Sequence, residues 1–195
     1  MGKIFYLMGK SASGKDTIFK KIMEDERICL KNIVMYTTRP IRSGEVNGVD
    51  YYFVTEEEAA QLEQQGRIIE MRQYSTVHGI WKYFTVSDEQ IDLQEHSYLM
   101  IGTLESYRKT KDYFGEEHLV PLYVTVPDGI RLERALEREK RQPVPKYAEM
   151  CRRFLADEED FKEENLKACH IAEEFENIAA DQCVERLVQR MLKEI

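Results

Sequence analysis

A glycine-containing loop near the start of the chain constrains the possible fold more than any other feature. Residues 9–16 read GKSASGKD and fit the phosphate-loop pattern G-x-x-x-x-G-K-[ST] at every position except the last, where Asp16 replaces the hydroxyl residue. An apolar run at 3–8 precedes the loop, and a helical pattern at 17–25 follows it. In such a strand-loop-helix unit, backbone N–H groups and a helix N-terminus converge on phosphate oxygens. The sequence therefore predicts a nucleotide-phosphate site in an α/β domain.

We expect ATP on this loop, with Lys15 neutralising the β- and γ-phosphates. The candidate ATP-binding residues are Gly9, Lys10, Ser11, Ala12, Ser13, Gly14, Lys15, Asp16 and Thr17. The hydroxyl residue that is replaced normally ligates Mg²⁺, and a carboxylate is also a hard oxygen ligand, although it adds negative charge beside the triphosphate. Asp16 is therefore a candidate Mg²⁺ ligand, with Thr17 and water as the alternative.

Strand-like and helical patterns alternate along the remainder of the chain, which favours a parallel α/β sheet. Further strands are expected at 33–36, 51–54, 67–75, 81–86, 98–101, 119–126 and 170–172, and helices at 56–65, 87–95, 104–114, 128–141, 146–167 and 180–194. The charged helices at 128–141 and 146–167 are joined by a polar break that contains Pro143 and Pro145. This arrangement indicates a hinged lid.

The 195 residues suit one domain with three parts. We expect a core at about 1–36, 98–130 and 168–195, an insertion at about 37–86 that grips the acceptor, and a lid at about 131–157.

Charge and cysteine content limit the class of protein. The formal net charge of −8 argues against a protein that wraps nucleic acid, because such proteins neutralise many phosphates with a basic surface. The early apolar stretch at 4–8 is too short to span a bilayer. Four cysteines lie scattered without metal-ligand spacing, which suits reduced thiols in a cytoplasmic protein. We expect small-molecule substrates, no nucleic-acid partner, no membrane association, and a monomer or homodimer.

A second polar cluster lies at residues 37–53. Arg39 and Arg42 are three residues apart, and the phenol of Tyr51 follows nine residues further on. Such a set can clamp a phosphate dianion, because arginine forks match its oxygens and a tyrosine hydroxyl adds another hydrogen bond.

With this cluster the sequence closely resembles the guanylate kinase family. The family signature T-[ST]-R-x-x-[KR]-x-x-[DE]-x-x-G-x-x-Y-x-[FY] is satisfied from Thr37 through Phe53, and the phosphate loop lies at the correct distance upstream. The resemblance implies a three-layer P-loop NTPase fold with a central parallel sheet, a small acceptor-binding insertion and a helical lid. It also implies a nucleoside monophosphate kinase, a transferase that uses ATP and Mg²⁺ to convert GMP to GDP.

The resemblance also implies roles for particular residues. Arg39, Arg42 and Tyr51 would hold the acceptor monophosphate. Glu70 falls where the family has a carboxylate that accepts hydrogen bonds from guanine N1–H and the exocyclic amine, donors that adenine does not offer together. The catalytic residues would be Lys15 and three lid arginines that stabilise charge during transfer, namely Arg134, Arg138 and Arg153.

The sequence departs from the family at two places. The family's Tyr-Tyr-Gly-Ser element is replaced by the stretch 78–84, HGIWKYF, and a strand with paired aspartates is replaced by 99–105, LMIGTLE. Of the four histidines, His78 is the one whose position is notable. These departures bear on the identity of the acceptor more than on phosphoryl transfer.

Two alternatives remain. Ribose 1,5-bisphosphate phosphokinases also have Asp after the phosphate-loop lysine and a His-Gly-aliphatic-aromatic stretch similar to 78–81, whereas the G-E-x-x-G-x-D-Y element at 44–51 resembles the GMP-binding form. A catalytically degenerate, protein-binding module of the same family is the other alternative. ATP-dependent phosphorylation of an acceptor separates the kinase readings from the binding module.

Overall fold

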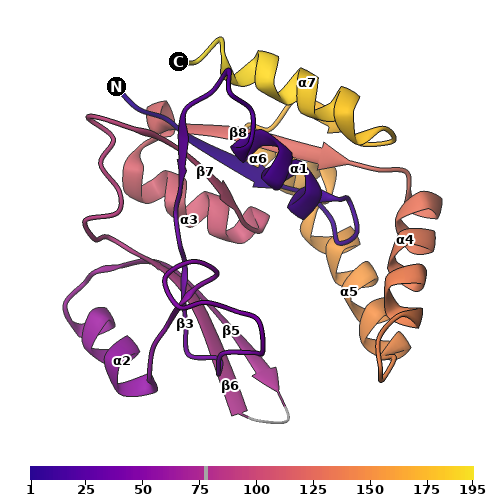
Figure 1. The fold of residues 1–195 in the computed structure, drawn as a ribbon, viewed down its shortest axis with the longest axis horizontal. Helices are drawn as coiled ribbons and strands as arrows, with labels where there is room; N and C mark the ends of the chain where they lie inside the picture. Colours follow the sequence, from indigo (N-terminus) through magenta and orange to yellow (C-terminus); the bar gives the residue numbers. More distant parts are fainter. Residues whose placement is uncertain (77–78) are drawn as a thin grey trace.

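A parallel β-sheet forms the centre of the computed structural model, which describes residues 1–76 and 79–195. Its strands are β1 (Ile4–Met8), β2 (Leu30–Asn32), β7 (Ser97–Ile101), β8 (Leu119–Thr125) and β9 (Glu174–Glu176). The strand order is β2-β7-β1-β8-β9, and every neighbouring pair is parallel. The predicted α/β fold with a central parallel sheet is therefore confirmed (Figure 1).

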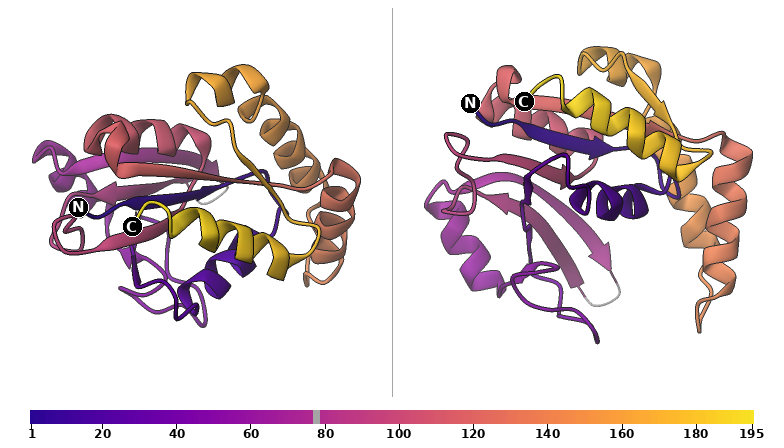
Figure 2. Two further views of the ribbon diagram at one scale, coloured as in Figure 1. Left: turned by 90° about the horizontal axis from the view of Figure 1, so that it is seen from above. Right: turned by 45° about the horizontal axis from the view of Figure 1, so that its top comes forward.

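Helices cover both faces of this sheet and give three layers (Figure 2). The helices of the outer layers are α1 (Lys15–Met23) and α7 (Ala180–Met191) on one face, and α3 (Leu104–Phe114) and α6 (Glu163–Ala168) on the other. Side chains along a strand alternate between faces, so Phe5 joins the core with α1 and α7 whereas Tyr6 joins the core with α3. All of β1 is buried, and the strand that enters the glycine loop is thus anchored in the core.

A smaller mixed sheet occupies the region of residues 36–86. Its strands are β3 (Tyr36–Thr37), β4 (Tyr52–Phe53), β5 (Ile68–Thr76) and β6 (Gly79–Val86), in the order β4-β3-β6-β5. Helix α2 (Glu56–Gln64) packs Ala59 against Phe84 and Val86 of this sheet. A capping box begins this helix, because the side chains of Thr55 and Glu58 each accept a hydrogen bond from the other's backbone N–H.

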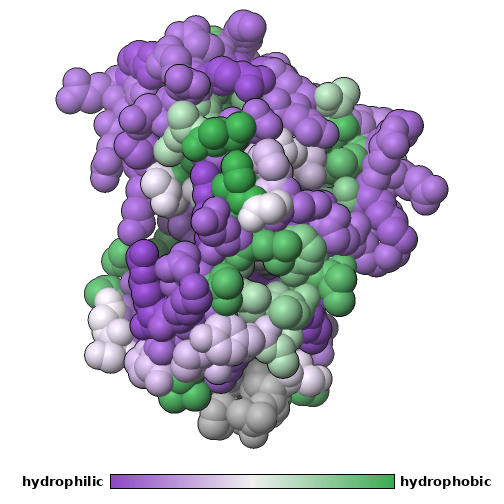
Figure 3. Space-filling model, turned by 90° about the vertical axis from the view of Figure 1, so that its right-hand side faces the viewer, coloured by the Kyte–Doolittle hydropathy of each residue, from purple (hydrophilic) through white to green (hydrophobic). Residues whose placement is uncertain are grey.

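Two further helices, α4 (Asp128–Lys140) and α5 (Tyr147–Asp160), form an arm beside the glycine loop (Figure 1). A short 3-10 turn, η1 (Glu116–His118), precedes β8. The surface on the side of the arm is largely hydrophilic, with apolar side chains gathered in its middle (Figure 3). Within residues 1–76 and 79–195, no helix has the length and apolar character needed to cross a bilayer.

The expected helix at 87–95 is wrong, since these residues form turns. The side chain of Asp88 accepts a hydrogen bond from the backbone N–H of Gln90, and Asp92 accepts one from Gln94. Aspartates that bond to backbone two residues ahead compete with helix formation. His78 lies outside the described residues.

Three expected boundaries are also wrong. Of the strand expected at 33–36, only Tyr36 lies in a strand, and residues 33–35 connect β2 to β3, because the N–H of Val34 bonds to the side chain of Gln90 instead of a neighbouring strand. The helix expected at 146–167 breaks after α5, where Phe161 stacks on Tyr123 at a 5.3 Å centroid distance. The last strand is β9 rather than 170–172, because His170, at φ 57°, is still capping α6.

Candidate active site

The glycine loop connects the end of β1 to the first turn of α1. Gly14 has φ 86°, a left-handed conformation, and a Cβ atom there would lie 2.5 Å from Nδ2 of Asn177. Ala12 is also left-handed, with φ 62°. Backbone conformation and lack of space therefore both require glycine at position 14.

Lys15 begins α1 and folds back over the loop. Its Nζ donates to the carbonyl oxygens of Gly9 at 2.6 Å and Lys10 at 3.0 Å, and it lies 3.4 Å from Oγ of Ser13. Burial lowers the pKa of Lys15 to about 8. The amine is thus held inside the loop, in the position where a phosphate-loop lysine faces its ligand.

Asn177 braces the loop from the end of β9. Its Nδ2 donates to the carbonyl oxygen of Ser13 at 2.7 Å, and Arg134 donates to the carbonyl oxygen of Asn177 at 3.1 Å. Arg134 therefore contacts the loop through a buried intermediary. Sequence reasoning overlooked Asn177 because it placed the last strand too early; the available signal is that side chains after parallel strands gather at one edge of the sheet.

A buried arginine joins the arm to the loop. Arg131, on α4, is 1% exposed and donates to Asp128 at 2.9 Å and to Glu158 at 2.5 Å. It also bonds to the carbonyl oxygen of Ser11 at 3.3 Å and to Asp157 at 3.4 Å. Each of these groups stabilises the guanidinium charge, which would otherwise be costly at this depth. The sequence marks Arg131 only as one of several arginines on a charged helix.

The carboxylate of Asp157 contacts the loop directly. Its Oδ2 accepts a hydrogen bond of 2.7 Å from the backbone N–H of Ser11, and Arg153 donates to Oγ of Ser11 at 3.3 Å. Lys10 forms a 2.7 Å ion pair with Glu158, one residue further along α5. Acidic and basic side chains of α5 therefore both hold the arm against the loop.

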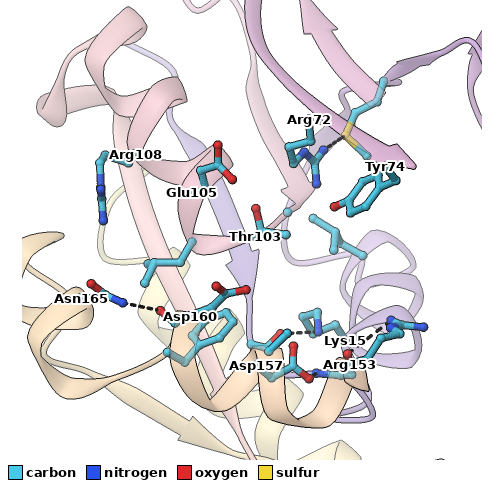
Figure 4. Close-up of a pocket in the computed structure, with 18 of the residues that line it drawn as sticks. Lys15, Arg72, Tyr74, Thr103, Glu105, Arg108, Arg153, Asp157, Asp160 and Asn165 are labelled. Atoms are coloured by element: carbon cyan, nitrogen blue, oxygen red, sulfur yellow. Dashed lines mark hydrogen bonds between the residues drawn. The ribbon is translucent and has the colours of Figure 1, made fainter. Parts of the chain in front are cut away.

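A cavity of about 720 Å³ opens between the loop and the smaller sheet. Lys15, Arg153 and Asp157 line one end, Arg72 and Tyr74 line the other, and Thr103 lies between them (Figure 4). Tyr51 lines this cavity and also an adjoining one of about 1190 Å³.

The predicted phosphate clamp is only partly turned toward these cavities. Arg42 is exposed and lines the adjoining cavity together with Tyr51. Arg39 is 3% exposed, and its guanidinium pairs with both carboxylate oxygens of Glu45 at 2.8 and 3.0 Å. The Arg39 side chain also lies 5.6 Å from the ring centroid of Tyr51. In this arrangement Arg39 supports the clamp, and Arg42 and Tyr51 face the open space.

Glu70 is buried next to Arg72, which lines the other end of the cavity. Its carboxylate accepts hydrogen bonds from Thr85 at 3.0 Å and from Nε and Nη2 of Arg72 at 3.2 and 3.4 Å. The side chain of Glu70 is 0% exposed and that of Arg72 is 11% exposed. Sequence reasoning overlooked Arg72, although residues two apart on a strand share a face.

The remaining candidates lie around these cavities. Arg138 is exposed and lines a third cavity of about 370 Å³, which Arg42 and Arg153 also line. Asp16 and Thr17 are exposed in the first turn of α1. Within the described part of the chain, no three His, Cys, Asp or Glu side chains cluster closely enough to hold a metal ion. Mg²⁺ commonly uses one or two protein oxygens together with substrate phosphates, a donor set that Asp16 and Thr17 suit.

Comparison with known proteins finds similarity to guanylate kinases. The guanylate kinase family model matches residues 1–92. Guanylate kinase of Malacoplasma penetrans is 26% identical over 95% of this chain and 96% of that protein. Guanylate kinases of Oceanobacillus iheyensis and Streptococcus pneumoniae are 47% and 32% identical over 37% and 69% of this chain, and the matched regions span 35% and 63% of those proteins.

The fold is similar to that of a solved guanylate kinase. The crystal structure of guanylate kinase from Anaplasma phagocytophilum superposes with a TM-score of 0.67 at 22% sequence identity, over 99% of this chain and 86% of that one. The structure and the Malacoplasma relative extend the similarity beyond the region of the family model. In its glycine loop, its three-layer fold and these sequence matches, the chain is similar to guanylate kinases.

Proposed function

We propose that this protein transfers the γ-phosphoryl group of ATP to GMP, which gives ADP and GDP. The observation that carries the proposal is a cavity lined both by Lys15 of the glycine loop and by Tyr51 of the predicted phosphate clamp. A donor and an acceptor phosphate bound at these residues would share that space. A phosphate oxygen of GMP then attacks the γ-phosphorus, and the bond to the bridging oxygen of ADP breaks.

Residues 9–17 hold ATP in this proposal. Loop N–H groups and the N-terminus of α1 bind the phosphate oxygens, and Lys15 leaves its contacts with Gly9 and Lys10 for the β- and γ-phosphates. Asp16 or Thr17 provides the protein oxygen for Mg²⁺, which neutralises charge on the phosphates when it is bound.

The acceptor occupies the part of the cavity next to the smaller sheet. Arg42 and Tyr51 bind the GMP phosphate, and Arg39 either holds Tyr51 in place or exchanges Glu45 for the phosphate. Glu70 belongs to the guanine end of this site. Residues 37–86 act as the acceptor-binding insertion.

The region of 131–157 acts as the lid. Arg153 already lies in the cavity, so it is the first candidate to stabilise charge on the transferred phosphoryl group. Arg138 needs movement of the arm to reach the phosphates, because it is exposed in the third cavity. Arg134 acts mainly through Asn177, whose side chain supports Ser13.

Ribose 1,5-bisphosphate is the second candidate acceptor, and Arg72 is the observation that favours it. A guanidinium at the end of the cavity opposite Lys15 suits a second phosphate, which GMP does not have. The relatives of this chain favour GMP.

An ATP-consumption assay with product identification tests the proposal. Wild-type protein with Mg²⁺ is assayed against GMP, AMP and ribose 1,5-bisphosphate, beside Lys15→Met and Lys20→Met. Lys20 is an exposed lysine of the same helix, so its loss controls for one positive charge. GDP formation by wild type and Lys20→Met, but not by Lys15→Met, supports the proposal. Product from the ribose bisphosphate alone supports the second candidate, and silence on all acceptors supports a protein-binding module.

A further inference from the structure

The buried carboxylate of Glu70 has little capacity left for a ligand. It accepts three hydrogen bonds, one from Thr85 and two from Arg72, and its side chain has no exposed surface. A purine edge would have to displace Arg72 to reach it. Displacement would strand a charge in a site that is 0% exposed, which is unfavourable.

Arg72 instead presents donors to the cavity. The guanidinium has five N–H groups in a planar fork. Its Nε and one side of Nη2 are directed to the two oxygens of Glu70, while Nη2 also lies 3.3 Å from Sδ of Met35, a weak acceptor. As far as residues 1–76 and 79–195 are concerned, the hydrogen bonds of this guanidinium involve Nε and Nη2. The N–H groups of Nη1 therefore face the ligand space, and the outer N–H of Nη2 joins them when a ligand displaces the weak acceptor Met35.

The surroundings of Arg72 suit a planar ligand. Arg72 and Tyr74 lie on the same face of β5, two residues apart, and both line the cavity that contains Lys15 (Figure 4). Met35 lines the same cavity. A phenol ring and a thioether provide apolar contact for a base, and the arginine edge provides two parallel donors.

We propose that Arg72 is the residue that reads guanine, by donating to the O6 and N7 acceptors of the base, and that Glu70 is a positioning residue acting through it. Guanine presents O6 and N7 as adjacent acceptors, whereas adenine replaces O6 with an amino donor. This inference rests on the proposed GMP kinase function. It assigns base recognition to the O6/N7 edge rather than to the N1 and 2-amino edge.

Recognition through the O6/N7 edge and recognition through the N1/2-amino edge predict opposite results for two analogues of GMP. IMP keeps O6 and N7 but lacks the 2-amino group, and 7-deaza-GMP keeps the 2-amino group but lacks the N7 acceptor. We expect wild-type kcat/KM for IMP to stay within about threefold of GMP. For 7-deaza-GMP we expect a loss of about fivefold or more, and for AMP a loss of roughly 5- to 150-fold, the range for a bidentate arginine–guanine contact.

Variants then connect the effect to this residue. In Arg72→Ala the ratio of GMP to 7-deaza-GMP activity should fall to about one, because the partner of N7 is gone. Arg72→Lys should keep the positive charge that pairs with Glu70 in the fold. It should lose the two parallel hydrogen bonds to the base, because lysine has no planar fork of donors. Glu70→Gln should reduce the same ratio, a change that a merely structural role would not produce. Arg67→Ala should behave as wild type, since this exposed arginine at the start of β5 bonds only weakly, to Ser87 at 3.4 Å.

The analogue comparison in wild-type protein keeps the inference testable even if Arg72→Ala fails to fold. Full activity on 7-deaza-GMP with a loss on IMP would overturn the inference and leave the GMP kinase function intact. A ratio unchanged by Arg72→Lys or Arg72→Ala would also overturn it. Absence of GDP formation by wild type would overturn the proposed function and this inference together.

Discussion

The carboxylate of Asp157 accepts a 2.7 Å hydrogen bond from the backbone N–H of Ser11, within the glycine loop. Loop N–H groups are the donors that a phosphate oxygen uses, so the carboxylate and a triphosphate compete for the same group. The contact also keeps α5 against the loop in the ligand-free protein. ATP binding would then require Asp157 to leave and the arm to adjust.

We expect Asp157→Asn to bind ATP about 3- to 10-fold more tightly, because it removes like-charge repulsion of about 1 kcal/mol beside the triphosphate. Calorimetric titration with ATP measures this change. Glu159→Gln is the matched control, since Glu159 lies on the same helix and pairs with Lys162 at the surface. Weaker or unchanged ATP binding by Asp157→Asn would contradict the competition.

Arg131→Met should destabilise the fold by about 3 kcal/mol. Arg131 is 1% exposed and bonds to Asp128, Asp157 and Glu158, and removal of one partner from a buried ion network costs about 3–5 kcal/mol. The lower end applies because the carboxylates are partly hydrated. Urea unfolding gives the change in free energy. Arg152→Met, which removes an exposed pair with Glu149, should cost less than about 1 kcal/mol; equal losses would argue against the network.

Gly14→Ala and Gly44→Ala separate backbone strain from lack of space. Both glycines are left-handed, with φ 86° and φ 89°, but a Cβ at Gly44 would meet nothing within 4 Å, whereas one at Gly14 would meet Asn177. Strain should cost each variant about 1–2 kcal/mol, and overpacking should add about 1–3 kcal/mol at Gly14 only. Unfolding free energies measure the difference. ATP binding should weaken in Gly14→Ala alone, because Asn177 supports Ser13.

The lowered pKa of Lys15 predicts a pH dependence of ATP binding. Burial lowers this pKa to about 8, and bound phosphates favour the charged amine, so binding above about pH 8 must take up a proton. The Kd for ATP should be flat below about pH 7 and rise by up to about tenfold per pH unit above pH 8. Lys20→Met should follow the wild-type curve and Lys15→Met should be flat.

The same shift affects the ligand-free fold with a defined sign. The pKa of Lys15 is lower in the folded protein than the unfolded value of about 10.4. Between about pH 8 and 10 the folded state binds fewer protons, so the contribution of Lys15 to stability should increase as the pH rises through this window. Thermal unfolding of wild type against Lys15→Met checks it, and a decrease in that contribution would contradict the burial of the amine.

The parts of the fold that follow from local sequence are those with a strong local signal. The run at 4–8 is uniformly apolar and becomes β1 at the centre of the sheet, and Thr55 with Glu58 forms the capping box that begins α2. The failures come from tertiary interactions. The break after Asp160 lets Phe161 stack on Tyr123, and the stretch at 33–35 is held by Gln90, which lies far along the chain.

The residues of the candidate site fall into the same two groups, those that a local motif predicts and those that only the tertiary structure brings to the site. Lys15 and Tyr51 belong to contiguous motifs, and both line the cavity of about 720 Å³. Asn177 and Asp157 reach the loop from segments more than 140 residues away, and no motif connects them to it. The two-residue spacing of Arg72 from Glu70 could have identified Arg72 from the sequence. That Glu70 is the fully buried partner depends on β6, which supplies Thr85.

The proposed reaction moves the γ-phosphoryl group of ATP to GMP. It is tested most directly by incubating the purified protein with Mg²⁺, GMP and ATP labelled at the γ-phosphate, and by locating the label in the separated products. We expect label in the β-phosphate of GDP, with one ADP formed for each GDP. Label found only in inorganic phosphate or in unreacted ATP would contradict it.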